Sequence, residues 1–327
     1  SKANRIAIYT RNKKKKWTKV KEITAPKNSI PEKFGYGFGG KLTLNGSTLV
    51  INVAIRKPKK YSVDKNSNKL DNTWDKYLNS ILVENYSINL DQEKKVKIIS
   101  MPKINNNMIS SYASDGETIV FFSMKKQSGE WLSKIGLLYD EKINYIPQPK
   151  SITNSDIHMF NTSIVVKNNL LLIGSINNYV REAWLFNLKN PEREPQKIET
   201  NINASMGITV AISEEFAAVG ETSGYHYYKD SKNSPRTLIK SLKNGSTKTI
   251  DGYGSLKLNK DILLRIRPRK INFPESDIIE VFRLDEDATP HLIKKRKGIK
   301  NAYIDNNLLA TVKRYDSNKK ICIESVH

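Results

Sequence analysis

The sequence contains very little of what would identify a chemistry or a cellular compartment. Among 327 residues there is one cysteine, Cys322, so an internal disulfide bond is excluded. No apolar run approaches the length of a membrane-spanning helix, and the first residues, SKANRIAIYTR, lack the apolar core of a signal peptide. The residues therefore predict no transmembrane segment and leave localisation and oligomeric state undetermined.

Signatures of catalysis and metal binding are also scarce. The four histidines have no metal-ligand spacing, and no glycine-rich phosphate loop is present, so we predict neither a metal site nor a cofactor. His158 and Tyr253 precede two predicted first strands, and they are the side chains to watch as catalytic groups. Structural roles are favoured for both, and the sequence favours a protein that is not an enzyme.

A repeated strand–turn–strand phrase is what the sequence does contain. Its turn positions are Gly46, Gly116, Asn168, Glu214, Lys260 and Asn306. The last three steps are each 46 residues, the step before them is 52 and the first is 70. Asn-Gly, Asp-Gly and Asn-Asn at several of these turns suit tight hairpins. A period near 46 with β-type units is typical of a β-propeller.

Each phrase is followed by a third apolar strand and, in most copies, by a weaker fourth. In the repeat around Glu214, YHYYK (225–229) is the expected third strand and TLIKS (237–241) the expected fourth. Four antiparallel strands per repeat match the blade of a propeller. We therefore predict an all-β fold, a β-propeller of four-stranded antiparallel blades, with six blades favoured and seven possible.

The ends of the chain suggest how such a ring closes. IAIYTR and TKVKEI near the N-terminus resemble third and fourth strands, whereas the C-terminus stops on a third strand. TKVKEI could then complete the last blade, so that both termini close the ring. The prediction is a single domain over residues 1–327, with a basic loop or short helical excursion inserted at 56–80.

Two segments carry a family resemblance. FGYGFGGKLTLNGSTLVINVAI (34–55) and GITVAISEEFAAVGE (207–221) resemble the FG-GAP-like repeat of secreted and surface β-propellers. The resemblance implies a propeller that binds partners or ligands rather than catalysing, at a secreted, periplasmic or cell-surface location. Calcium-binding members carry spaced aspartates between the first two strands. The turns here are too short to form such a calcium site, so the resemblance does not predict calcium binding.

Charge gives the strongest functional indication. The chain has 55 basic and 33 acidic residues, a formal net charge of +22, and such a field attracts polyanions. Loops between second and third strands, and links to the next blade, emerge on one propeller face. The predicted binding residues on that face are Arg56, Lys57, Lys59, Lys60, Arg265, Arg267, Arg269, Lys270, Lys294, Lys295, Arg296, Lys297 and Lys300.

A second predicted feature is a polar row along the first strands, which line the central channel of a propeller. The residues five positions before each turn are Lys41, Ser111, Ser163, Thr209, Ser255 and Asn301. One interpretation, which we favour, is that these side chains bond trapped water. The other is a polar throat for a small anion or sugar.

These observations favour a non-catalytic propeller whose basic face recognises a polyanion, either acidic glycan or nucleic acid, or an acidic protein surface. One alternative is a lyase or hydrolase that acts on acidic polysaccharide. The other is a structural module of a larger protein assembly.

Overall fold

The structure, a computed structural model, describes part of the 327-residue chain. The described residues are 5–11, 17–25, 42–45, 48–56, 81–89, 96–99, 107–115, 118–127, 130–139, 142–147, 163–174, 183–198, 208–221, 236–252, 254–267, 278–297, 299–305, 308–315 and 318–326. They form strands and turns. No described segment forms a helix with the length and apolarity needed to cross a bilayer.

The chain divides into two compact units. Unit 1 comprises Ser1–Met108 and Ser114–Glu117, and unit 2 comprises Ile109–Ala113 and Thr118–His327. Unit 1 contains an antiparallel pair of strands and a four-stranded sheet in the order β3-β4-β5-β6. Its strands are β1 (Arg5–Arg11), β2 (Trp17–Thr24), β3 (Leu42–Asn45), β4 (Thr48–Arg56), β5 (Ile81–Asn89) and β6 (Val96–Ile99).

Most of the described chain lies in the sheets of unit 2. Four sheets have four strands each and the last has three, and strands adjacent in sequence pair with one another. The first two sheets contain β7 (Asn107–Ser114), β8 (Ile119–Gln127), β9 (Glu130–Tyr139), β10 (Lys142–Ile146), β11 (Ser163–Lys167), β12 (Leu170–Gly174), β13 (Ala183–Asn187) and β14 (Gln196–Ile198).

The remaining sheets follow in the same pattern. The third sheet contains β15 (Ile208–Ile212), β16 (Phe216–Glu221), β17 (Arg236–Ser241) and β18 (Thr247–Asp251). The fourth contains β19 (Ser255–Asn259), β20 (Ile262–Arg267), β21 (Ile278–Leu284) and β22 (Pro290–Lys297). The last contains β23 (Ile299–Asp305), β24 (Leu308–Tyr315) and β25 (Asn318–Ser325).

Tight turns at the repeat positions set the register of the first two strands. Asn168 and Asn169 have φ of 48° and 61°, and Lys260 has φ of 52°, values that two-residue hairpins require. Asn168 also donates a hydrogen bond of 2.6 Å to Oε1 of Glu214, 46 residues further on. Equivalent turns of successive repeats therefore lie side by side, as the period predicts.

Apolar side chains fill the space between successive sheets of unit 2. Each of four buried clusters draws its residues from two consecutive sheets. Trp184, Phe121 and Phe122 are among the largest fully buried side chains. Because the three middle sheets each contribute both faces to such layers, their strands combine β-branched and aromatic residues with little polar alternation. No single sheet could bury its faces alone.

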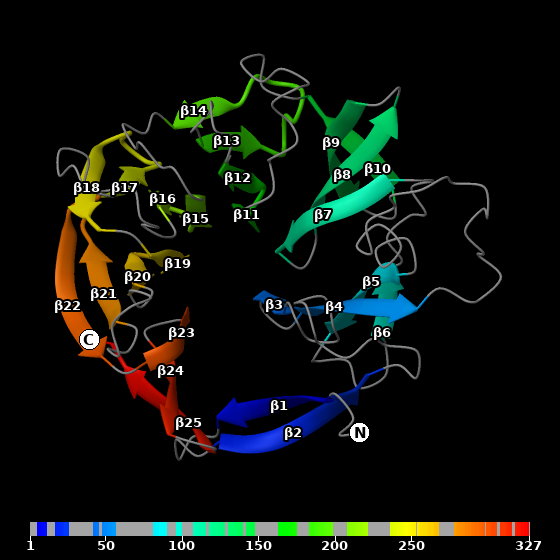
Figure 1. The fold of residues 1–327 in the computed structure, drawn as a ribbon. Coiled ribbons are helices and arrows are strands. Elements are labelled where there is room, and N and C mark those ends of the chain that lie inside the picture. Colours follow the sequence, from blue (N-terminus) through cyan, green and yellow to red (C-terminus); the bar gives the residue numbers. More distant parts are fainter. Residues whose placement is uncertain are drawn as a thin grey trace. The chain divides into compact units, whose positions relative to one another are not determined.

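Stacked four-stranded antiparallel sheets of this kind define a β-propeller fold, and the predicted fold class is correct. In Figure 1 the first strands of the sheets, β11, β15, β19 and β23, lie on the inner side of unit 2, and β14, β18 and β22 lie on its outer side. β1 pairs with β2, and β25 ends a sheet in which three strands are described. The number of blades, the closure by both termini and the single domain stay predictions.

One strand assignment was wrong. TLIKS, expected as a fourth strand, lies in β17, which pairs with β16 and is therefore the third strand of its sheet. The fourth strand is β18, which the sequence reasoning missed because TKTID is short and polar. Leu238 and Ile239 are buried in β17, so burial rather than aromatic content decided the pairing. YHYYK lies outside the described residues.

Candidate functional site

Basic residues gather at one end of the β19–β22 sheet. Arg265 pairs in register with Glu280, which pairs with Lys295 on the outer strand β22. Two rows further along, Arg267 pairs with Ile278, which pairs with Lys297. Because β20 and β22 run parallel to each other, their C-terminal ends lie at the same edge of the sheet. The fold thus brings together two basic segments that lie far apart in sequence.

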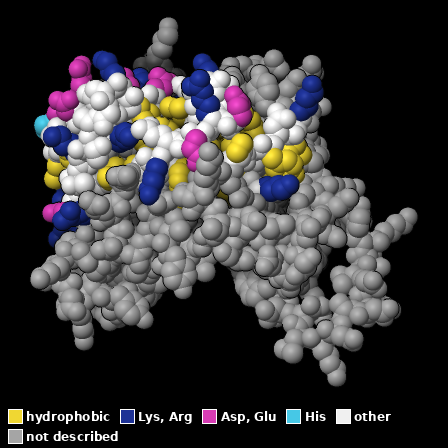
Figure 2. Space-filling model, turned by 90° about the horizontal axis from the view of Figure 1, so that it is seen from above, with side chains coloured by type: hydrophobic (Ala, Val, Ile, Leu, Met, Phe, Trp, Pro, Cys, Tyr) yellow, Lys and Arg dark blue, Asp and Glu magenta, His cyan; other side chains and the backbone are white. Residues whose placement is uncertain are grey.

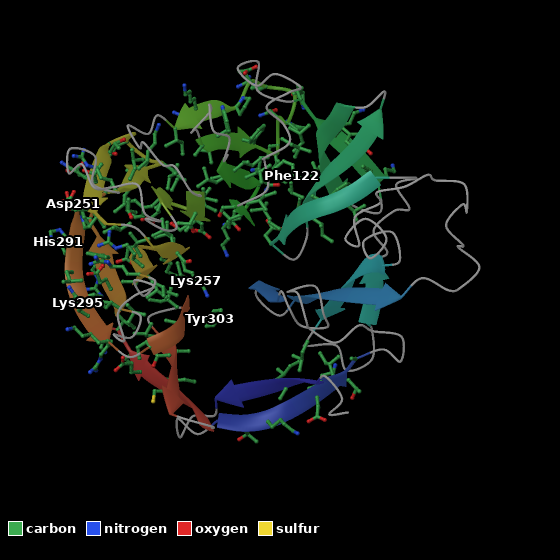
Figure 3. The ribbon with its side chains drawn as sticks, in the orientation of Figure 1. Phe122, Asp251, Lys257, His291, Lys295 and Tyr303 are labelled. Carbon is green, nitrogen blue, oxygen red and sulfur yellow. The ribbon has the colours of Figure 1, made fainter. Side chains whose placement is uncertain are left out.

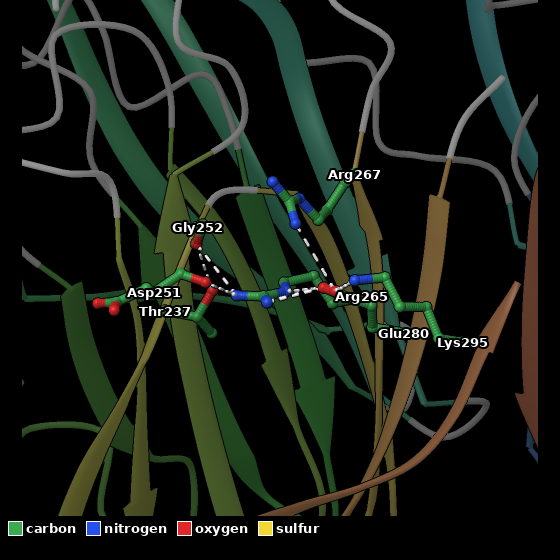
Figure 4. Close-up of polar contacts among 7 residues, drawn as sticks. All are labelled: Thr237, Asp251, Gly252, Arg265, Arg267, Glu280 and Lys295. Carbon is green, nitrogen blue, oxygen red and sulfur yellow. Dashed lines mark hydrogen bonds and ion pairs between the residues drawn. The ribbon is translucent and has the colours of Figure 1, made fainter. Parts of the chain in front are cut away.

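Arg265 is buried rather than exposed, which corrects its place among the predicted binding residues. Its side chain is 3% exposed and that of Glu280 is 6% exposed. Nη2 and Nε of Arg265 donate hydrogen bonds of 2.7 Å and 3.0 Å to Oε2 of Glu280. Nη1 donates to the carbonyl oxygens of Asp251 and Gly252, at 2.8 Å and 3.2 Å (Figure 4). The guanidinium thus joins two sheets instead of facing solvent.

Glu280 is the centre of this network. Arg267 Nη1 and Lys295 Nζ lie 3.6 Å and 3.3 Å from its Oε1 atom (Figure 4). Burial alone would raise the pKa of Glu280, but the hydrogen bond and charge of Arg265, with help from Lys295, hold that pKa below its usual range. Burial lowers the pKa of Arg265, and Glu280 opposes this change. The carboxylate is therefore ionised and surrounded by three cations.

A second carboxylate forms ion pairs with basic side chains on the other side of β22. Glu324 Oε2 on β25 lies 2.9 Å from Lys294 Nζ and 3.3 Å from Arg296 Nη2. Burial would raise the pKa of Glu324, but the hydrogen bond and charge of Lys294, together with Arg296, lower it. These pairs connect the outer strand of one sheet to the last strand of the next.

Among the described residues at this end of the sheet, positive charge exceeds negative charge. We define the basic cluster as Arg267, Lys294, Lys295, Arg296 and Lys297. The side chains of Lys295 and Arg296 are 48% and 51% exposed, and Lys297 is also exposed. The two carboxylates that pair with the cluster, Glu280 and Glu324, cannot neutralise all five cations. In Figure 2, however, basic and acidic side chains are intermingled over the described part of one side, so charge there is not of a single sign.

Two of the other predicted binding residues lie on described strands. Arg56 ends β4, and Lys300 lies in β23. The remaining members, Lys57, Lys59, Lys60, Arg269 and Lys270, lie outside the described residues, as do most of the 56–80 insertion and both His158 and Tyr253. Among the described residues no group of three or more His, Cys, Asp or Glu side chains could hold a metal ion.

Two of the six residues in the predicted polar row have a structural role. Ser163 Oγ accepts a hydrogen bond of 2.9 Å from the backbone N–H of Val210 on the next first strand. Thr209 Oγ1 accepts one of 3.2 Å from the backbone N–H of Leu256, one repeat later. Ser255 is exposed. Ser111 and Asn301 lie on first strands, and Lys41 lies outside the described residues. Sequence reasoning did not foresee that these hydroxyls would join adjacent sheets.

Sequence reasoning also missed a pair on the inner strands. Lys257 Nζ on β19 lies 3.1 Å from the ring centroid of Tyr303 on β23, and both side chains are labelled on the inner side of unit 2 in Figure 3. Burial lowers the pKa of Lys257 to about 8. Tyr303 is 53% exposed. A signal was present, because these residues follow Ser255 and Asn301 by two positions and so share their strand faces.

Comparison with known proteins supports the fold. No protein-family model and no curated protein sequence matches the chain. Among solved structures, the β-propeller domain of the Trilobed protease from Pyrococcus furiosus is 13% identical, with a TM-score of 0.53, over 88% of this chain and 80% of that one. A structure of prolyl endopeptidase is 12% identical, with a TM-score of 0.56, over 88% of this chain and 40% of that one.

A third similar structure is the acylaminoacyl peptidase of Pyrococcus horikoshii. It is 11% identical, with a TM-score of 0.51, over 87% of this chain and 44% of that one. The chain thus spans less than half the length of both peptidases. At such low identity these similarities establish the β-propeller fold alone. The resemblance to FG-GAP-like repeats stays a prediction.

Proposed function

We propose that this propeller binds a linear polyanion through the basic cluster, without catalysing a reaction on it. The observation that supports the proposal is the register of β20, β21 and β22, which aligns Arg267 with Lys297 at the sheet edge that also carries Lys295 and Arg296. Phosphate, sulfate or carboxylate groups spaced along a chain would replace water around the exposed ammonium and guanidinium groups. Lysine-rich contacts of this kind give affinity without fine shape recognition.

The distribution of the carboxylates also supports a surface that accepts anions. Glu280 is buried beneath the cluster, and Glu324 lies between β22 and β25. Both contact the charged ends of cluster side chains, but Lys295 and Arg296 stay about half exposed, and Lys297 has no ion pair among the described residues. A polyanion would therefore meet cations first, and the two carboxylates would keep those cations in position.

Salt dependence provides the test. Binding of a labelled heparin oligosaccharide should weaken steeply with salt, because each neutralised cation contributes roughly 0.7–0.9 to the slope of log affinity against log salt. The double variant Arg296→Gln/Lys297→Gln should lower that slope by about 1–2. It leaves the Glu280 network intact. Lys243→Gln/Lys248→Gln is the matched control, because it removes the same charge from exposed residues of another sheet.

Equal losses in both double variants would show that net charge alone attracts heparin, and would reject a site on β22. A salt-independent affinity would reject polyanion binding altogether. Single-stranded DNA in a parallel titration separates nucleic acid from acidic glycan, because it shares the charge but not the sulfated sugar.

A further inference from the structure

Lys257 is a partly buried cation whose charge no carboxylate of the described residues neutralises. No Asp or Glu in the described part of the chain forms an ion pair with it, and burial is the cause that lowers its pKa. The neighbouring interior cation Arg265 has Glu280, and the half-buried Lys294 has Glu324. Removing a charge from water is costly unless an opposite charge compensates it. Among the described residues, Lys257 therefore has no compensating anion of the kind that those two cations have.

The surroundings of Lys257 are those of a small binding site. Its ammonium lies over one face of Tyr303, and this aromatic ring is half exposed on an inner strand (Figure 3). An ammonium has three N–H donors, so those directed away from the ring remain able to donate to an oxygen. Ser255 is exposed on the same face of β19, two residues before Lys257. An aromatic surface with a few polar groups is the usual lining of a ligand site.

We propose that Lys257 and Tyr303 form a binding site for a sugar that carries a carboxylate or a phosphate. The anionic group accepts hydrogen bonds from Nζ of Lys257, and the apolar face of the sugar ring lies against the exposed part of Tyr303. The Ser255 hydroxyl is placed to bond a sugar hydroxyl. The site is separate from the basic cluster, because it uses the inner strands β19 and β23 instead of the outer strand β22.

Binding to four small compounds tests the proposal on the full chain. Glucuronate is a sugar with a carboxylate, and glucose 6-phosphate is a sugar with a phosphate. Glucose carries neither anionic group, and inorganic phosphate lacks the sugar. Saturation-transfer NMR with calorimetry should show binding of one or both acids at least about tenfold tighter than glucose or inorganic phosphate. Preference between the two acids decides whether carboxylate or phosphate is the group recognised.

Variants separate the site from general electrostatic attraction. Lys257→Met should weaken binding of the preferred acid by about tenfold to a hundredfold, because a charge-assisted hydrogen bond is lost. Tyr303→Ala should weaken it less, by removing the ring surface. Lys248→Met, an exposed lysine in β18, is the matched control and should leave binding unchanged. Heparin binding should not change in Lys257→Met, so this site and the basic cluster can fail independently.

The pKa of Lys257 provides a further test. If Lys257 and Tyr303 had a purely structural role, this pKa would stay the same when the acid is added. A bound anion favours the ammonium, so a lysine-selective NMR titration should show the pKa rising above about 8 when the preferred acid is added. The same linkage makes affinity fall as the pH rises through that value. The proposal is overturned if neither acid binds at about 10 mM, if Lys257→Met binds as the wild type does, if inorganic phosphate binds as tightly as the sugar acids, or if the pKa does not move.

Discussion

Two interior cations on neighbouring strands of one sheet have different kinds of partner. Arg265 on β20 pairs in register with Leu256, the residue before Lys257 on β19. The Arg265 guanidinium donates to Glu280 and to two backbone carbonyls. The Lys257 ammonium lies instead against the ring of Tyr303. Because adjacent residues of a strand face opposite sides, the two cations serve different interfaces of the same sheet.

The difference separates a structural charge from a candidate binding charge. A buried cation such as Arg265, whose guanidinium donates four hydrogen bonds, has little left to offer a ligand. A partly buried ammonium on an aromatic ring still has donors and a charge that no described carboxylate neutralises. An abundance of basic residues therefore does not by itself indicate where ligands bind. The positions of the carboxylates decide it.

The largest expected effect comes from removing the carboxylate of the compensated pair. Glu280→Ala leaves Arg265 buried with only carbonyl partners, and breaking such a pair costs about 3–5 kcal/mol of unfolding free energy. Urea unfolding near neutral pH measures it. Glu192→Ala, an exposed glutamate in a turn, is the control and should change stability by less than about 0.5 kcal/mol. A loss of similar size in both variants would mean that the pair is not an interior anchor.

Replacing both members of the Arg265–Glu280 pair measures how strongly the two side chains are coupled. In Arg265→Met/Glu280→Met no buried charge is left uncompensated, and apolar replacement of an ion pair is often close to neutral. The double variant should therefore lose less stability than the sum of the two single variants, by about 2 kcal/mol. A thermodynamic cycle from four unfolding curves measures this coupling. Additive losses would show that Arg267 and Lys295 hold Glu280 equally well without Arg265.

The sequence could predict the repeats, but not which charges face solvent. The period near 46 and the Asn-rich turns were enough for the propeller fold, because turn chemistry and apolar strands are local properties. Arg265 was expected to be exposed since it lies in the basic segment RIRPRK. Its burial depends on Glu280, which is a cross-strand neighbour only once the register of β20 and β21 is known.

The contact between Lys257 and Tyr303 and the role of the polar row also could not be predicted from the sequence. Extending the phased row by two residues would have placed Lys257 and Tyr303 on strand faces in successive repeats, yet nothing local indicates that their side chains meet. Likewise, Ser163 and Thr209 were expected to contact water or ligand. They accept backbone hydrogen bonds from the next first strand, a contact that depends on how sheets pack.

The free energy of unfolding should depend on pH through Lys257, which has no ion pair among the described residues. The pKa of Lys257 is about 8 in the folded protein against an ordinary value of 10.5, so between these values the unfolded chain binds more protons and stability rises with pH. Relative to Lys257→Met, the wild type should gain about 1–3 kcal/mol across this window. Chemical unfolding at both ends of the window measures the gain. Parallel curves for the two proteins would show that the ammonium is not desolvated.

The smallest expected effect concerns the hydrogen bond that positions the strand carrying Lys257. Thr209→Val keeps the shape of the side chain but removes the acceptor for the N–H of Leu256, which should cost about 1 kcal/mol, because that N–H is then left without a partner in the interior. Urea unfolding measures the loss. If β19 is held mainly by its apolar packing, the pKa of Lys257 in this variant should stay near the wild-type value. A changed pKa would mean instead that one hydroxyl of the preceding sheet controls how deeply the ammonium is buried, and that the inner site depends on contacts between first strands.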